Sequence, residues 1–261
     1  DPQFFQTIGY ALAMAGGYIV GKIFKLSTEI CLFLAALVGA LVAGAGFDVF
    51  RHFAEGSVTY FDIGLIFIFA TLFMNILKES GAMDLIVRWI IRVFGGKKIL
   101  FLILLMVVML IPGALTGAGS ISVLVVGGTV SAALGAMGLK KERVAAIIFI
   151  VAGLSAAAPP VNVWAMMTCA GTAVPYVGFT WPLLVPVLIL GLFTVLFLGW
   201  KGKIPNIQEA LKAIPEPVGL SVWSVAIPFI ALIALLALPR IIPFDFPMLG
   251  LPLSFAISAL V

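Results

Sequence analysis

The sequence predicts an all-α integral membrane protein of several spans, interrupted by one re-entrant helical hairpin and one discontinuous helix. Of its 261 residues, 63% are hydrophobic and only 10% are charged, whereas a soluble domain has roughly 25% charged residues. Apolar runs of 18 or more residues recur along the chain without the polar stripe of a soluble core helix. The 27 Gly agree with this class, because Gly is commoner in spanning helices than in soluble ones.

Three apolar segments begin the chain. We expect an N-terminal membrane helix within residues 1–26, a second helix at about 28–47 and a third at about 61–77, with a polar loop at 48–57. The N-terminus lacks the basic start and the small-residue cleavage site of a signal peptide, so we expect the first helix to be retained.

The next segment is predicted to be an amphipathic helix at the membrane surface. Over residues 82–94, Asp84, Arg88 and Arg92 recur at four-residue spacing, opposite an apolar face that includes Trp89. Charged and apolar residues on opposite faces are typical of a helix that lies in the interface.

A glycine-rich stretch at residues 112–122 is predicted to form the tip of a re-entrant hairpin within residues 99–138. The stretch is Pro-Gly-Ala-Leu-Thr-Gly-Ala-Gly-Ser-Ile-Ser and carries no charge. The apolar arms at 99–111 and 123–137 would reach only ~20 to 23 Å as helix, less than a ~30 Å hydrocarbon core. Short arms joined by a small polar tip predict a hairpin that enters and leaves by the same membrane face.

A second interruption follows inside the apolar region at 144–174. Pro159-Pro160-Val161-Asn162 divides this region into two half-helices, which together supply about 40 Å of helix, enough for one tilted crossing with an unwound middle. We expect a closing helix at 181–200, a cytoplasmic linker at 201–218, and in residues 219–261 the start of a second half that continues beyond this sequence.

The distribution of Lys and Arg predicts the topology. Loops around residues 22–25, 78–98, 140–143 and 201–212 hold 13 of the 15 Lys and Arg, leaving only two outside, at Arg51 and Arg240. Cytoplasmic loops carry an excess of these residues, so we expect a periplasmic N-terminus and a hairpin that opens to the cytoplasm. The same pattern fits two full crossings in place of the hairpin. Because the net charge of +4 lies mainly in these loops, no nucleic-acid partner is predicted.

The hairpin tip and the helix break are predicted to form a binding site together. Discontinuous helices expose N–H groups that suit an anionic substrate and carbonyl groups that suit a cation such as Na⁺. Hydroxyls at Thr116, Ser120 and Ser122 and the amide of Asn162 add polar groups, and the glycines let a ligand approach bare backbone. The alternative is that these small residues serve helix packing. Ser122, Thr168 and Thr172 are candidate substrate contacts; the alternative for the two threonines is a hydrogen bond to their own preceding turn.

Other polar residues have simpler interpretations. We expect Asn75 to bond a neighbouring helix, and Asp62 to be an interfacial carboxylate or a proton-coupling group. We expect Cys31 and Cys169 to be buried apolar side chains, and His52 to be solvated in a loop. The sequence has no His/Glu metal cluster, nucleophile elbow or phosphate loop, so enzymatic activity is not predicted.

At these residues the chain resembles the large permease subunit of TRAP (tripartite ATP-independent periplasmic) transporters, within the wider ion transporter superfamily. The order of interfacial helix, hairpin, broken helix and closing helix is similar from about residue 60 to 200. The matching residues are Gly113-Ala114-Leu115-Thr116-Gly117, Pro159-Pro160, Gly171, the turn at 174–178, and Pro182 to Pro186.

The resemblance implies an elevator-type secondary transporter of two inverted repeats, of which residues 27–200 are the first. It implies that a Na⁺ gradient drives the uptake of organic acid anions, such as C4-dicarboxylates or sialic acid, across the bacterial inner membrane. It implies two protein partners, a small membrane subunit and a periplasmic substrate-binding protein. The residues to which it assigns Na⁺ are Gly113, Thr116, Gly117, Ser120, Pro160 and Asn162. The alternatives are a self-sufficient dicarboxylate carrier of the same superfamily and a structural membrane subunit without a site.

Overall fold

The computed structural model describes the whole chain except residues 1, 205–206, 218, 220, 242–249 and 261. The protein is 81% helix, with no strand in the described part, which confirms the all-helical class. Within the described residues, three helical segments are long and apolar enough to cross a membrane: Gly46–Glu79, Lys98–Thr116 and Thr180–Gly199. The chain divides into two compact units, residues 1–60 and 61–261, and the boundary falls inside α3 (Val49–Glu79).

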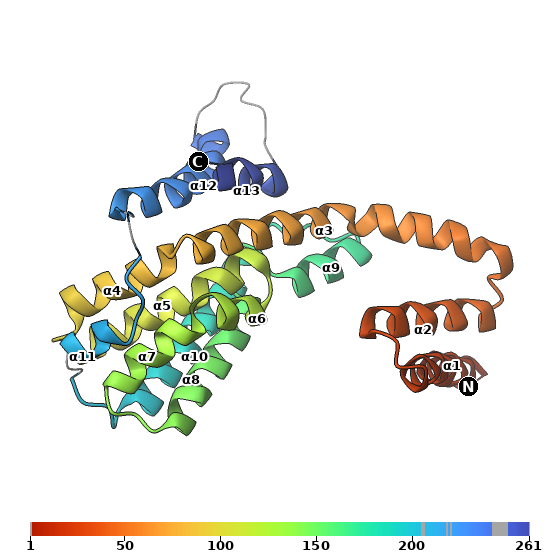
Figure 1. The fold of residues 1–261 in the computed structure, drawn as a ribbon. Coiled ribbons are helices and arrows are strands. Elements are labelled where there is room, and N and C mark those ends of the chain that lie inside the picture. Colours follow the sequence, from red (N-terminus) through yellow and green to blue (C-terminus); the bar gives the residue numbers. More distant parts are fainter. Residues whose placement is uncertain (1, 205–206, 218, 220, 242–249, 261) are drawn as a thin grey trace. The chain divides into compact units, whose positions relative to one another are not determined.

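The first unit is built on two closely packed helices, α1 (Pro2–Ile23) and α2 (Thr28–Val42), drawn in red in Figure 1. Gly21 of α1 lies so near Cys31 of α2 that a Cβ at Gly21 would stand 2.8 Å from the Cys31 Sγ. Small residues let membrane helices approach in this way. Cys31 and Cys169 are both buried free thiols, as predicted.

The polar stretch at residues 48–57 is helical, so the predicted loop is wrong. After a 3-10 turn at Gly46–Asp48 (η1), the chain enters α3, which runs for 31 residues. Arg51 and Glu55 form an ion pair of 2.9 Å between Nε and Oε1, and pairs of opposite charge four residues apart support a helix. His52 therefore lies on a helix, exposed, with its Nδ1 3.6 Å from the Glu55 carboxylate.

The second unit holds the remaining helices. α5, α8 and α10 pack against one another (Figure 1). The predicted second half contains two helices, Val222–Ile241 and Leu251–Leu260, whereas residues 242–249 and the side chain of Arg240 lie outside the described part. In chain order the elements are α4 (Ala82–Phe94), α5 (Lys98–Thr116), α6 (Gly119–Ser122), a π-helical turn η2 (Val123–Gly127), α7 (Gly128–Ala136), α8 (Lys141–Ala157), α9 (Val163–Gly171), α10 (Thr180–Gly199), α11 (Ile207–Lys212), α12 (Val222–Ile241) and α13 (Leu251–Leu260).

The first arm of the hairpin is longer than the sequence pattern predicts. α5 continues through Pro112 to Thr116 and has 19 residues, about 28 Å of helix. The returning arm is helical from Gly119 to Ala136. The prediction that the first arm is too short to cross a membrane is therefore wrong, because α5 is long and apolar enough to do so. Helices of these lengths fit either a re-entrant hairpin or two crossings, and the re-entrant form stays a prediction.

Three hydrogen bonds gather basic loops at one end of the second unit. Lys98 Nζ donates to the carbonyl of Trp200 at 2.6 Å, and Arg143 Nη1 donates to the carbonyl of Leu198 at 3.0 Å. The backbone N–H of Lys203 donates to the carbonyl of Met137 at 2.8 Å. Cations suit the carbonyl end of a helix, here α10. The mouth of the hairpin, the start of α8 and the end of α10 thus lie together.

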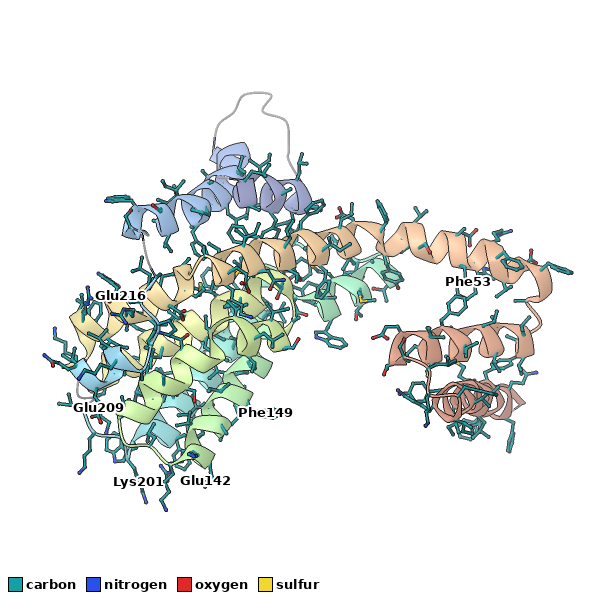
Figure 2. The ribbon with its side chains drawn as sticks, in the orientation of Figure 1. Phe53, Glu142, Phe149, Lys201, Glu209 and Glu216 are labelled. Carbon is teal, nitrogen blue, oxygen red and sulfur yellow. The ribbon has the colours of Figure 1, made fainter. Side chains whose placement is uncertain are left out.

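The charged face of α4 packs against the segment that contains α11. Arg88 is only 8% exposed, and its Nη1 donates to the carbonyls of Leu211 at 2.8 Å and Ile214 at 2.7 Å. Its Nη2 lies 3.1 Å from the Glu216 carboxylate, which is labelled in Figure 2. The predicted helix at 82–94 is confirmed, and its polar side holds the linker at 201–218 in place.

We expect Arg88→Ala to lower the free energy of unfolding by about 2 kcal/mol, because two buried carbonyls would lose their charged donor. Arg92→Ala is the matched control. Arg92 is 60% exposed and lies 3.8 Å from the same carboxylate, so its loss should cost less than about 0.5 kcal/mol. Unfolding of the purified protein in detergent measures both values, and equal losses would contradict the anchoring role of Arg88.

Candidate functional site

Gly117 ends α5 at the hairpin tip. Its φ of +70° is in the left-handed region, and its N–H donates to the carbonyl of Gly113 at 2.7 Å, the usual glycine stop of a helix. A Cβ at Gly117 would stand 2.3 Å from Val163 Cγ2 and 3.0 Å from the Val163 backbone nitrogen. Both the backbone conformation and the closeness of α9 therefore require glycine here.

Asn162 bridges the predicted helix break, which is confirmed between Ala157 and Val163. The Asn162 Oδ1 accepts from the N–H of Ala165 at 3.0 Å and caps α9, while its Nδ2 donates to the carbonyl of Ala157 at 3.0 Å. The peptide bond between Pro159 and Pro160 is cis. One buried side chain thus joins the end of α8 to the start of α9.

The hairpin tip and the helix break are in direct contact, as the sequence predicts. The N–H of Val161 donates to the carbonyl of Ala114 at 3.0 Å. A Cβ at Gly119 would stand 2.3 Å from the carbonyl oxygen of Ala152. The last carbonyls of a helix have no donors within that helix. Here the N–H of Val161, in the break, donates to one of these carbonyls, that of Ala114.

A chain of buried hydrogen bonds next to this contact joins the hairpin to α8. The N–H of Gly113 donates to Ser122 Oγ at 2.8 Å, Ser122 Oγ lies 2.9 Å from Ser155 Oγ, and Ser155 Oγ lies 2.6 Å from the carbonyl of Ala152. Each hydroxyl has a single proton. Ser155 gives its proton to the carbonyl, so Ser122 donates to Ser155. Both serines are fully buried, and the chain joins α5, α6 and α8.

The other predicted site residues fall into two groups. Thr116 is fully buried, and its hydroxyl donates to the carbonyl of Pro112 at 2.7 Å. Ser120 and Pro160 are exposed beside the contact. Thr168 and Thr172 are also exposed, and their hydroxyls bond the carbonyls of Trp164 and Thr168 at 2.9 and 2.8 Å. These two threonines therefore bond their own preceding turns, the alternative left open by the sequence.

Two residues at the site were missed by sequence reasoning. Ser155 is the single hydroxyl residue between positions 144 and 158, which was a usable signal. Tyr176 follows α9 and stacks on Phe179 with 6.1 Å between ring centroids. Its hydroxyl oxygen is buried without a well-formed hydrogen bond in the described part of the chain. Burial raises the pKa of Tyr176, and the nearby backbone N–H of Asn162 opposes part of that rise.

We expect Asn162→Ala to cost about 1 to 2 kcal/mol of stability, because the cap of α9 and the bond to Ala157 are both lost. Asn162→Ser should recover about 1 kcal/mol, since serine caps a helix but is too short to reach Ala157. Thermal unfolding in detergent compares the two variants. Equal stability of Asn162→Ser and Asn162→Ala would show that the cap contributes nothing.

The chemistry of the junction is that of oxygen donors and helix ends. α5 and α8 end here with carbonyl groups, and helical segments begin here at Gly119 and Val163 with N–H groups. The described residues contain no group of three or more His, Cys, Asp or Glu side chains that could hold a metal ion. Comparison of the chain with known protein families, curated proteins and solved structures finds no match.

Proposed function

We propose that the protein is a component of a Na⁺-coupled secondary transporter that moves small organic acid anions across the bacterial inner membrane. The observation that carries this proposal is the hydrogen bond from the Val161 N–H to the Ala114 carbonyl, 3.0 Å long. It joins two helix interruptions that are far apart in the sequence. Interrupted helices whose ends meet are the usual construction of ion and substrate sites in secondary transporters.

We assign Na⁺ to the oxygen-rich side of the junction. The carbonyl ends of α5 and α8 carry partial negative charge, and the six residues that bound this region are Gly113, Thr116, Gly117, Ser120, Pro160 and Asn162. Na⁺ is a hard cation that takes carbonyl and hydroxyl oxygens. The hydroxyl of Thr116 is supplied by the last turn of α5.

We assign the organic anion to the N–H side of the junction, where helical segments begin at Gly119 and Val163. Positive partial charge at helix N-termini favours a carboxylate. Ser122 is fully buried, and its hydroxyl is hydrogen-bonded to that of Ser155. In this proposal Ser122 therefore stabilises the site and does not contact the substrate. The exposed Thr168 and Thr172 would reach a substrate only by giving up the bonds to their own turns.

An elevator mechanism needs the hairpin and the broken helix to move as one body. Three contacts that join them support this: Val161 with Ala114, Ser122 with Ser155, and Gly119 against Ala152. In this proposal the protein is a TRAP-type large subunit, as the sequence resemblance implies, with the periplasmic N-terminus that the Lys and Arg distribution predicts. A small membrane subunit and a periplasmic substrate-binding protein would assist it, also by the resemblance.

Uptake by proteoliposomes tests the proposal. The complete protein, reconstituted with its small membrane subunit, is given a labelled C4-dicarboxylate or labelled sialic acid, with and without Na⁺ and the binding protein. We expect uptake only when both Na⁺ and the binding protein are present. Uptake without the binding protein would instead identify a self-sufficient carrier, and the absence of uptake under every condition would identify a structural subunit.

A further inference from the structure

A groove with a volume of about 570 Å³ lies between α5 and α10, at the end of the second unit where the basic loops gather. This volume is within the range of ordinary ligand pockets. Most of the lining is aliphatic, and the polar residues stand at one end. The lining residues are Lys97, Lys98, Ile99, Leu100, Leu102, Ile103, Leu196 and Trp200.

The polar end of the groove is basic. The Lys98 Nζ lies 5.6 Å from the centroid of the Trp200 ring and bonds the Trp200 carbonyl. Lys97 is exposed beside it, and the exposed Lys201, labelled in Figure 2, follows Trp200 in the chain. Among the described residues, none that lines the groove is acidic, and the first turn of α5 contains no acidic residue. An anion at this end would therefore meet ammonium groups without a competing carboxylate.

α10 also exposes apolar side chains that do not line the groove. Phe193 and Phe197 are 62% and 65% exposed, and their rings stack with centroids 5.4 Å apart. With Trp200 they follow a spacing of four and three residues, which places the three rings on one helix face. An apolar band thus extends from the basic residues along the helix axis.

We propose that this groove binds an anionic phospholipid, with the phosphate at Lys97 and Lys98 and an acyl chain against the aliphatic lining. Basic pockets between membrane helices bind anionic headgroups, and Trp prefers the headgroup level of a bilayer. The basic residues of the groove complement the phosphate of a lipid headgroup, and its aliphatic lining complements an acyl chain. A free organic anion would satisfy only the basic end.

The lipid site is separate from the candidate transport site. Lys98 begins α5 and Thr116 ends it, so the two sites lie about 27 Å apart along this helix. The Lys98 bond to Trp200 ties the start of α5 to the end of α10, and the bound lipid would fill the space beside that tie. Its predicted role is to hold the mouth of the hairpin against α10.

Native mass spectrometry of the complete protein tests this assignment. The probes are phosphatidylglycerol and phosphatidylcholine with identical acyl chains. We expect the protein to retain phosphatidylglycerol at least about fivefold better than phosphatidylcholine. We expect Lys97→Gln to lower the retention of phosphatidylglycerol about fivefold, the effect of one basic residue at an anionic lipid. Lys140→Gln makes the same charge change at the same end of the unit without lining the groove, and should leave retention unchanged.

Three results would overturn the assignment. The first is equal retention of the two lipids by the unmodified protein. The second is an equal loss in Lys97→Gln and Lys140→Gln, which would indicate only a general attraction of the basic end. The third is displacement of phosphatidylglycerol by glycerol phosphate at the same molar ratio, which would identify a site for a free phosphate ester rather than for a lipid.

Discussion

Gly117→Ala is expected to abolish transport and to lower the free energy of unfolding by about 3 kcal/mol or more. The new methyl group would be placed 2.3 Å from Val163 Cγ2 and 3.0 Å from the Val163 backbone nitrogen. The φ of +70° adds the usual penalty for an L side chain in the left-handed region. The start of α9 must therefore move away from the hairpin tip, and this movement opens the junction that we assign to the ion.

Gly138→Ala separates the two causes of that loss, the clash with Val163 and the left-handed backbone conformation. Gly138 has a φ of +72°, nearly the same as Gly117, and a Cβ there would come within 4 Å of no described residue other than its chain neighbours. This control should cost only about 1 to 2 kcal/mol, the conformational term, and should leave transport intact. Thermal unfolding and uptake are measured on both variants. Equal effects of the two substitutions would show that the contact between tip and break contributes nothing.

Gly113→Ala is the second substitution with a large expected effect. A Cβ at Gly113 would stand 2.0 Å from Ser155 Oγ and 2.9 Å from Ser122 Oγ. The methyl group would break the buried hydrogen-bond chain and separate α5 from α8. Overpacking costs about 1 to 3 kcal/mol, and the buried hydroxyls left without partners add about 1 to 3 kcal/mol.

Gly153→Ala is the matched control for Gly113→Ala. Gly153 is also inside a helix, α8, but a Cβ there would come within 4 Å of no described atom beyond its chain neighbours and the nearby backbone of α8. Because alanine favours helix over glycine by about 1 kcal/mol, we expect this variant to be as stable as the original protein or more stable. The double variant Gly113→Ala/Ser155→Gly should recover part of the loss, because the clashing side chain is removed. No recovery in unfolding measurements would contradict a direct clash with Ser155.

The sequence predicted the features that depend on local chemistry. α4 has the predicted ends, since its amphipathic pattern is continuous. The break is where Pro159 and Pro160 prevent an α-helix, and Asn162 is a good N-cap because its side chain accepts from Ala165. In the second unit, the basic loops around residues 98, 143 and 203 lie together at one end, and the membrane orientation that the distribution of Lys and Arg predicts stays a prediction.

Two local predictions were wrong because polar residues, or Pro and Gly, were assumed to exclude a helix. Residues 48–57 are polar yet helical, and the ion pair between Arg51 and Glu55 supports that helix. Pro112 and Gly113 were assigned to the hairpin tip, but α5 includes both. Proline in a helix removes one hydrogen bond, and the packing of α5 against α8 outweighs that loss.

The contacts of the site could not be predicted from sequence because they join distant residues. The chain from Gly113 through Ser122 to Ser155 brings together three helices, and a single serine in an apolar segment does not identify its partner. The Tyr176 hydroxyl next to Asn162 is a similar case. The burial of Arg88 beneath the α11 segment also required the tertiary structure, because the sequence pattern shows only that the face is charged.

The Na⁺ dependence of uptake by Thr116→Val and Thr116→Ser proteins tests the central claim, that the tip and the break hold the coupling ion. The Thr116 hydroxyl bonds a carbonyl of its own helix, and valine has nearly the same shape, so both variants should fold with little change in melting temperature. We expect Thr116→Val to need at least about tenfold more Na⁺ for half-maximal uptake, about 1.4 kcal/mol for one lost oxygen ligand, and Thr116→Ser to behave like the unmodified protein. An unchanged Na⁺ requirement in Thr116→Val would contradict the claim.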